Sequence, residues 1–143
     1  MANNEAFSAK DIAQTEAFIE KCKAHIGGSK VMDICGGLGR NSGWLSKFFN
    51  TIDVQDLYPQ WGSTPPEKRG RLIQANLKDL KEHVTWGEYN CVFGCWALCY
   101  ISYANIKDLL ATIWSSLDDD GSFILKEPIL SKKETTPRLC TTG

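Results

Sequence analysis

Short apolar segments that alternate with amphipathic ones are the feature of this sequence that most restricts its fold. Apolar runs predict five buried strands, at residues 30–34, 51–57, 71–74, 89–95 and 122–127. Amphipathic segments predict a helix before the first strand, at residues 15–26, and helices between strands at residues 41–49, 77–83 and 106–117. Alternating strands and helices form a parallel sheet covered on both faces, and right-handed crossovers wind it in two directions. The predicted fold is therefore α/β, a doubly wound, Rossmann-like and mostly parallel five-stranded sheet.

The segments outside these elements are predicted to be turns, a loop and a tail. Residues 58–70 hold three prolines and two glycines and are expected to form a loop. Asn105 is the expected N-cap of the last helix. Three aspartates and a glycine at residues 118–121 are expected to form a turn rather than a calcium site. The length of 143 residues suits one domain, which we place at residues 1–128, followed by a C-terminal tail at 129–143.

Charge and hydropathy exclude several classes of partner. Sixteen Lys and Arg against 17 Asp and Glu give a net charge of −1, so we expect neither a nucleic-acid partner nor an anionic membrane surface. The most apolar stretch, residues 91–101, is too short to span a bilayer. The first ten residues are polar and resemble neither a signal peptide nor a transit peptide. The expected location is cytoplasmic, nuclear or both.

Six cysteines are present, and we expect them to be reduced, buried thiols. They are Cys22, Cys35, Cys91, Cys95, Cys99 and Cys140. Most lie in apolar or helical segments, unlike the loop cysteines of a small disulfide-rich domain. The C-x3-C-x3-C spacing at residues 91–99 matches neither a zinc pair nor a ferredoxin cluster. No metal site is predicted.

A glycine-rich turn and an acidic residue predict a ligand site. The turn CGGLGR, residues 35–40, follows the first strand, and ligands of doubly wound sheets bind beyond the carboxyl ends of strands where strand order reverses. Glycines permit positive φ and close approach of backbone N–H groups, and the helix beginning near Asn41 favours a carboxylate or phosphate. Asp56 ends the next strand, nineteen residues after Gly37, near the distance at which a carboxylate meets a ribose in dinucleotide-binding folds. A purely structural turn is the alternative interpretation.

The turn resembles the first motif of the class I S-adenosylmethionine-dependent methyltransferases. Its glycines fall as G-G-x-G rather than in the dinucleotide pattern G-x-G-x-x-G, and Asp33 lies two residues before it. The resemblance implies that Asp33 braces the loop and the methionine amino end of the cofactor. It also implies that the loop approaches the methionine carboxylate and the ribose, and that Asp56 is the ribose acid.

Four segments in order are similar to the protein N-terminal α-amine methyltransferases, the Xaa-Pro-Lys methyltransferase family. They are MDICGGLGR, IDVQDL, FGCWALCYIS and SLDDDGSFILKEP. With the leading helix, the similarity runs from about residue 11 to residue 128. The resemblance implies S-adenosylmethionine as cofactor and the N-terminal α-amine of a protein or peptide as methyl acceptor.

The resemblance also implies individual site residues. The cofactor-binding residues would be Asp33, Cys35, Gly36, Gly37, Arg40, Asp56, Leu57, Asn76, Leu77, Lys78 and Cys95. The counterpart of Arg40 contacts the methionine carboxylate. Trp96 would form one wall of the acceptor site and so contact the substrate. Tyr100 is expected to bind the substrate and to hydrogen-bond or help deprotonate its amine.

The sequence departs from the family at several of these positions. Cys35 stands where the family has the first glycine of the turn, and Lys78 and Cys95 stand in place of glutamines. Tyr100 replaces a histidine and Pro128 an asparagine. The family's covering N-terminal extension is largely missing, as are its final strands and the acidic residues that act on the amine. We therefore expect a methyltransferase-type fold truncated after the fifth strand.

Two other interpretations stay open. The chain could be a catalytically degenerate methyltransferase-fold subunit or scaffold, with a protein partner covering the sheet edge at the fifth strand, beside Phe123 and Leu125. It could also be a truncated or alternatively spliced isoform, because its tail has no apolar periodicity.

Overall fold

The computed structural model describes the backbone of residues 2–22, 24–26 and 28–127, with side chains from residue 9 onward. The strands are β1 (Gly28–Ile34), β2 (Phe49–Asp56), β3 (Arg69–Gln74), β4 (Tyr89–Cys95) and β5 (Leu117–Lys126). The α-helices are α1 (Ala2–Cys22), α2 (Ser42–Leu45) and α3 (Tyr103–Ser116). Three short 3-10 helices are η1 (Pro66–Lys68), η2 (Leu77–Glu82) and η3 (Leu98–Tyr100).

The five strands form one sheet in the order β3-β2-β1-β4-β5, and all four strand pairs are parallel. The prediction of a doubly wound, Rossmann-like α/β sheet is confirmed. The chain moves outward from β1 to β2 and β3, then returns to the other side of β1 to form β4 and β5. Strand order therefore reverses between β1 and β4, where doubly wound sheets bind their ligands.

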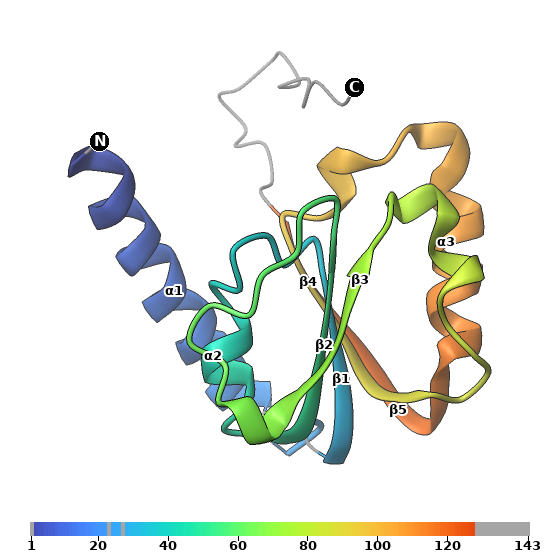
Figure 1. Cartoon of the computed structure of the whole chain (residues 1–143), viewed down its shortest axis with the longest axis horizontal. Coiled ribbons are helices and arrows are strands. Elements are labelled where there is room, and N and C mark those ends of the chain that lie inside the picture. Colours follow the sequence, from blue (N-terminus) through green and yellow to red (C-terminus); the bar gives the residue numbers. More distant parts are fainter. Residues whose placement is uncertain (1, 23, 27, 128–143) are drawn as a thin grey trace.

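Helices cover both faces of the sheet (Figure 1), and each face has its own core of buried side chains. On one face, α1 and α2 pack on Val31, Val54 and Phe93. On the other, α3 and η2 pack on Met32 and Val92. Alternate residues of a strand point to opposite faces, so strands covered on both sides are apolar at nearly every position. This is why their sequences read as continuous apolar runs.

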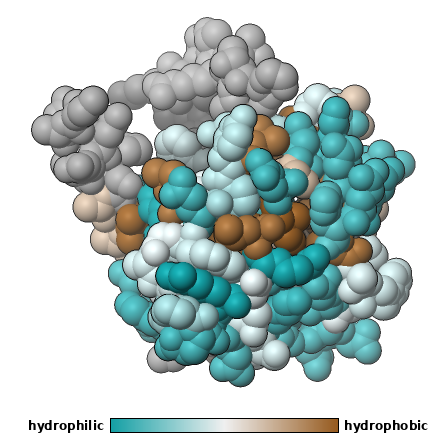
Figure 2. Space-filling model, in the orientation of Figure 1, coloured by the Kyte–Doolittle hydropathy of each residue, from teal (hydrophilic) through white to brown (hydrophobic). Residues whose placement is uncertain are grey.

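Apolar side chains also reach the surface. Figure 2 shows hydrophobic residues gathered in the middle of the face that it presents, with hydrophilic residues around them. Leu57 and Leu72 are among the exposed apolar residues of the chain. No helix in the described part of the chain is long and apolar enough to cross a membrane.

The first two helices differ from their predicted extents. The helix predicted at residues 15–26 runs instead from Ala2 to Cys22. Its first half lacks an apolar stripe but is rich in alanine, the strongest helix former. The helix predicted at 41–49 is only the single turn Ser42–Leu45, because Phe49 already begins β2 and pairs with Gly28.

Two predictions near the last helix are wrong. Asn105 lies inside α3, where its Nδ2 donates to Ser102 Oγ at 2.9 Å, and Ser102 is the residue at the helix N-cap. The aspartates at 118–121 belong to β5. They form an irregularity in that strand: Tyr89 pairs with Leu117, but Cys91 pairs with Ser122. The turn residues are thus accommodated as extra residues within a strand.

All five cysteines in the described part of the chain are free, and Cys140 lies outside it. Cys91 and Cys95 are buried as predicted, whereas Cys22, Cys35 and Cys99 are only partly buried. Burial raises the pKa of the Cys91 thiol to about 12, which keeps it protonated. The predicted tail at 129–143 and the domain boundary at 128 also lie outside the described residues and stay predictions.

Candidate active site

The glycine-rich turn after β1 is held against the end of β2. The Cys35 N–H donates to Gln55 Oε1 at 2.9 Å, and the Gly36 N–H donates to the Gln55 carbonyl at 3.0 Å. Gln55 Nε2 in turn donates to the Ala75 carbonyl at 2.7 Å, which extends the contact to the end of β3. Gly37 adopts φ +56°, a left-handed conformation that glycine adopts without strain. The turn is therefore braced by the two strands beside it.

Asp56 faces this turn from the carboxyl end of β2. Its Oδ2 accepts the Gly37 N–H at 3.1 Å, and its Oδ1 accepts the Tyr58 N–H at 3.0 Å. A carboxylate oxygen has two acceptor positions, so each oxygen retains one for a further donor. A Cβ at Gly37 would lie 4.0 Å from Oδ2, so a side chain there would reach into the space beside the carboxylate.

The loop after β2 packs on the other end of the turn. The Gln60 N–H donates to the Gly37 carbonyl at 2.9 Å. Gly39 has φ +80°, and a Cβ on it would lie 2.5 Å from the backbone nitrogen of Gly62. Only glycine fits this approach of two backbones. The loop predicted at residues 58–70 thus serves as a support for the glycine turn.

Asp33 lies beneath the turn and is fully buried. Its Oδ2 accepts a hydrogen bond from Ser42 Oγ at 2.9 Å, but its Oδ1 has no hydrogen-bond partner among the described residues. Burial raises the pKa of Asp33 to about 7, and the nearby Asp56 carboxylate adds to the rise. The Ser42 hydrogen bond and the Arg40 charge oppose this shift but do not cancel it. A buried carboxyl with one unsatisfied oxygen favours a cationic or hydrogen-bonding ligand beside it.

Arg40 lies at the end of the turn near α1 and β5. Its guanidinium approaches Asp11 Oδ2 at 3.8 Å, and Lys126 Nζ contacts Asp11 Oδ1 at 2.6 Å. Arg40 is exposed. Its long contact to Asp11 leaves most of its hydrogen-bonding capacity free for an anionic ligand.

The chain reverses sharply after β4, beside the glycine turn. Trp96 adopts φ +57° and its N–H donates to the Lys126 carbonyl at 2.9 Å. The carboxylate of Glu127 accepts the N–H groups of Ala97 at 2.7 Å and Leu98 at 2.8 Å. Cys35 Sγ lies 4.0 Å from the Ala97 carbonyl, so this turn touches the turn after β1.

Cys35 and Trp96 are the two non-glycine residues with positive φ in the described part of the chain. Such a conformation costs about 1–2 kcal/mol and tends to cluster at functional sites. Both residues directly follow strands that flank the reversal of strand order. The strain therefore coincides with the position at which topology predicts a ligand.

The remaining predicted residues divide into exposed and buried positions. Leu57, Lys78 and Tyr100 are exposed at the carboxyl edge. Asn76 is the N-cap of η2, where its Oδ1 accepts the Lys78 N–H at 3.2 Å. Leu77 is part of the core beneath α3.

Cys95 belongs to the opposite core, beneath α1 and α2. Together with Leu77, it presents its side chain to a core rather than to the shared edge. The other predicted positions gather at the carboxyl ends of the strands.

Three residues near the turns were not predicted from the sequence: Gln55, Tyr58 and Glu127. Gln55 is a polar residue within an apolar strand, and Glu127 is the first residue after β5. A polar side chain at such a position is a signal that could have identified both.

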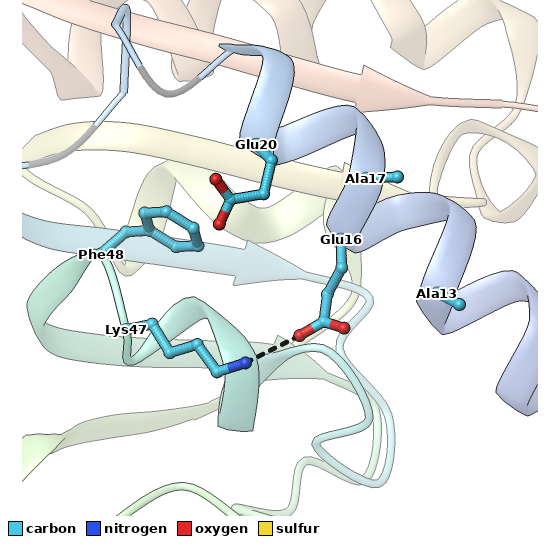
Figure 3. A pocket seen from close by; sticks show the side chains of 6 residues that line it. All are labelled: Ala13, Glu16, Ala17, Glu20, Lys47 and Phe48. Atoms are coloured by element: carbon cyan, nitrogen blue, oxygen red, sulfur yellow. Dashed lines mark hydrogen bonds and ion pairs between the residues drawn. The ribbon is translucent and has the colours of Figure 1, made fainter.

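A separate cavity of about 360 Å³ lies between α1 and the residues after α2 (Figure 3). Glu16 and Lys47 form an ion pair of 2.9 Å on its wall, beside Phe48. None of the predicted site residues lines this cavity. It is distinct from the glycine turn.

No protein-family model matches the sequence, and no curated protein matches it. Solved structures do match. A SAM-dependent methyltransferase from Leishmania major superposes with a TM-score of 0.71 and 20% identity, covering 84% of this chain and 50% of that one. A TehB-like SAM-dependent methyltransferase from Corynebacterium glutamicum gives 0.61 and 19%, over 86% and 70% of the two chains.

A third match is phosphoethanolamine N-methyltransferase 1 from Haemonchus contortus, solved with phosphoethanolamine and S-adenosylhomocysteine. Its TM-score is 0.60 at 19% identity, over 83% of this chain and 26% of that one. The chain thus spans about half the length of the Leishmania protein and a smaller share of the Haemonchus protein. The strand order, the parallel pairing and these superpositions agree: the chain has the fold of the class I S-adenosylmethionine-dependent methyltransferases.

Proposed function

We propose that the carboxyl edge of the sheet binds S-adenosylmethionine and that the protein transfers its methyl group to the N-terminal α-amine of a protein or peptide. The observation that carries the cofactor part is the pair of carboxylates at the glycine turn. Asp33 offers an unpaired buried oxygen, and Asp56 faces the turn from the next strand. Methyltransferases of the same fold have been solved with S-adenosylhomocysteine.

Each part of the cofactor has a candidate partner of matching chemistry. Its ammonium group suits the unpaired oxygen of Asp33, and its carboxylate suits the guanidinium of Arg40. The ribose diol suits Asp56, whose oxygens each retain an acceptor position. Exposed Leu57 and Tyr58 offer an apolar surface for the adenine. The residues present therefore fit the group.

The acceptor part of the proposal rests on resemblance and on position. Four segments of the sequence resemble the protein N-terminal α-amine methyltransferases, and the Leishmania structure, a SAM-dependent methyltransferase, has the same fold. Trp96 and Tyr100 follow β4 next to the glycine turn and are both partly exposed to solvent. The bound cofactor supplies an activated methyl group, so the protein's task is to align a deprotonated amine with it.

Calorimetric titration with S-adenosylhomocysteine tests the cofactor site. We expect one binding site and at least a tenfold loss of affinity in Asp56→Ala, because the carboxylate holds both the turn and the ribose. Asp119→Asn, which removes an exposed carboxylate in β5, is the matched control and should bind normally. Absence of binding to the unchanged protein at near-millimolar ligand would refute the proposal.

Proton release gives a second readout. The pKa of Asp33 is about 7, and a bound ammonium group would lower it. Binding at about pH 6 should therefore release close to one proton, and binding at about pH 8.5 close to none. Titrations in buffers of different ionisation enthalpy measure this number. Asp33→Asn should abolish the release.

Methyl transfer is tested with a peptide that begins Xaa-Pro-Lys and, as a control, with the N-acetylated peptide of the same sequence. Mass spectrometry should show added methyl groups on the free peptide alone. Ligand binding without methylation would favour the alternative function, a catalytically degenerate methyltransferase-fold subunit. The exposed aromatic side chains of Tyr103 and Trp114 on α3 specifically favour a role in association. A partner at the outer edge of β5 stays a prediction.

A further inference from the structure

Helix α3 carries a second apolar stripe that faces solvent. Tyr103 is 92% exposed, Leu110 43% and Trp114 80%. With Lys107, these residues recur at spacings of four, three and four, the pattern of a coiled-coil seam. At about 100° per residue they occupy one side of the helix. We call Tyr103, Lys107, Leu110 and Trp114 the α3 stripe.

The α3 stripe is distinct from the face that packs on the sheet. That inner face is formed by Ile106, Leu109 and Ile113, which belong to the core. The helix of a globular protein normally carries charged residues on its outer side. Here the outer side holds the α3 stripe and the exposed Ala104 and Ala111, and its charged residues are Lys107 and Asp108. Helix α3 is therefore apolar on two sides.

The loop before β4 extends this surface. Trp86 is 84% exposed, and the neighbouring Gly87 N–H donates to the Ser115 carbonyl at 2.9 Å, which fixes the loop beside the end of α3. Figure 1 shows α3 on the outer flank of the molecule, opposite α1 and α2. Exposed aromatic side chains of this number on one flank are typical of an interaction site.

We propose that the α3 stripe is the contact by which two copies of this chain form a dimer, with the two α3 helices antiparallel across a two-fold axis. Such an axis brings the same surface of both copies together. The proposal does not depend on the function of the carboxyl edge.

Charge selects the register of the two helices. A two-fold axis midway between Lys107 and Leu110 would bring both lysines close to it, and their repulsion disfavours that arrangement. An axis between Leu110 and Ala111 instead places each Lys107 opposite Trp114 of the second copy. An ammonium group is attracted to the face of an indole ring. Leu110 then packs against Ala111 of the second copy at the axis, where the small side chain allows close approach.

Sedimentation velocity and light scattering of the full chain test the dimer at concentrations from about 1 to about 200 µM. This range is used because an interface made by one helix of each copy is expected to be weak. We expect a shift from monomer to dimer across this range. Leu110→Glu should remain monomeric, since it places two carboxylates at the axis. Gln14→Glu, which adds the same charge to an exposed position of α1, is the control and should dimerise normally.

Two further variants test the register. Trp114→Glu should still dimerise, because each new carboxylate lies opposite Lys107 of the second copy. Lys107→Glu combined with Trp114→Glu should be monomeric, because carboxylates then face each other. Circular dichroism confirms that each variant is folded. A wild-type monomer at every concentration, or a monomeric but folded Trp114→Glu, would overturn the proposal.

Discussion

At the carboxyl edge of the sheet, several residues adopt conformations or environments that lower the stability of the folded protein. Cys35 and Trp96 adopt left-handed backbone conformations, and Asp33 buries a carboxyl with one oxygen unpaired. Each of these costs free energy of folding. A ligand that pairs with Asp33 and fills the space between the turns would recover part of this cost. The costly conformations at this edge are therefore consistent with the proposed cofactor site.

Asp33 should make the protein less stable as pH rises. Its pKa is about 7 in the folded protein and 3.8 in the unfolded chain. Between these values the folded state binds a proton that the unfolded state does not, so the free energy of unfolding falls with increasing pH and levels off above about pH 7. At about 1.4 kcal/mol per pKa unit, the loss is on the order of 2–4 kcal/mol. Urea unfolding at a series of pH values measures it.

The matched variant for this prediction is Asp33→Asn, which cannot ionise. Its stability should be nearly flat from about pH 4 to pH 8 relative to wild type. Asp119→Asn, at an exposed position, should leave the wild-type slope unchanged. Parallel curves for wild type and Asp33→Asn would contradict the assigned pKa.

At the scale of elements, one ion pair joins the first helix to the last strand. Lys126 Nζ of β5 contacts Asp11 Oδ1 of α1 at 2.6 Å and Thr15 Oγ1 at 2.8 Å. Asp11 is buried, and Arg40 approaches its other oxygen. Residues more than a hundred positions apart thus hold α1 across the end of the sheet, next to the glycine turn.

Asp11→Ala should lower the free energy of unfolding by about 1–3 kcal/mol, because it leaves the partly buried ammonium of Lys126 without its carboxylate partner. Adding Lys126→Met should restore part of the loss. Glu16→Ala removes an exposed ion pair between Glu16 and Lys47 and should cost at most about 0.5 kcal/mol. Urea unfolding compares the variants. Equal losses in Asp11→Ala and the double variant would show that the ion pair is not the cause.

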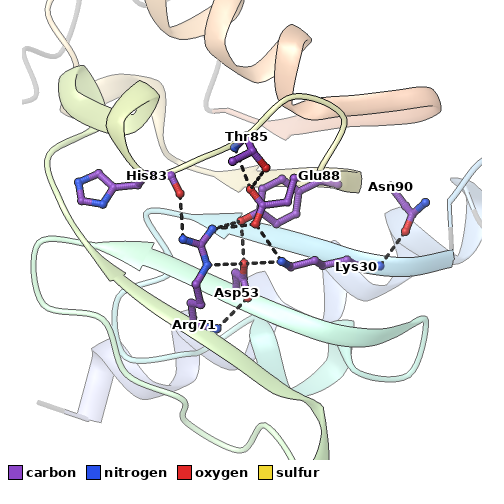
Figure 4. A network of polar contacts seen from close by, with 8 residues as sticks. Lys30, Asp53, Arg71, His83, Thr85, Glu88 and Asn90 are labelled. Carbon is purple, nitrogen blue, oxygen red and sulfur yellow. Dashed lines mark hydrogen bonds and ion pairs between the residues drawn. The ribbon is translucent and has the colours of Figure 1, made fainter.

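At the scale of the whole molecule, the two ends of the sheet differ in character. The amino-terminal half holds a polar network around the buried Asp53 (Figure 4), whose Oδ2 accepts the Tyr89 hydroxyl at 2.7 Å and lies 3.4 Å from Lys30 Nζ. Glu88 Oε1 contacts Lys30 at 2.9 Å and Arg71 at 2.8 Å. These side chains pair among themselves and leave little capacity for a ligand. The carboxyl ends carry the strained turns and the unpaired oxygen of Asp33.

Tyr89→Phe should therefore affect stability and not ligand binding. Burial and the Asp53 carboxylate raise the pKa of Tyr89, so its hydroxyl stays protonated and donates to Asp53. Its loss should cost about 1–2 kcal/mol in urea unfolding. The affinity for S-adenosylhomocysteine measured below the unfolding transition should not change. Tyr103→Phe is the exposed control, and weaker binding by Tyr89→Phe would show that the two ends are coupled.

The candidate site was predictable where its residues are defined by position along the chain. Asp56 and the glycine turn follow buried strands, so their place at the carboxyl edge follows from the apolar pattern. The side-chain directions of Leu77 and Cys95 were not predictable in this way. They depend on which face of the sheet each residue meets, and in the structure both face a core.

Apolar periodicity is a local property of the chain, so the sequence was sufficient to predict the alternation of strands and helices and hence the doubly wound sheet. The bounds of β4 were predicted as they occur. Tertiary structure decided the irregularity at 118–121, the positive φ of Trp96 and the unpaired oxygen of Asp33. Each depends on groups distant in sequence, such as the Lys126 carbonyl that accepts the Trp96 N–H. Local sequence patterns do not predict such contacts.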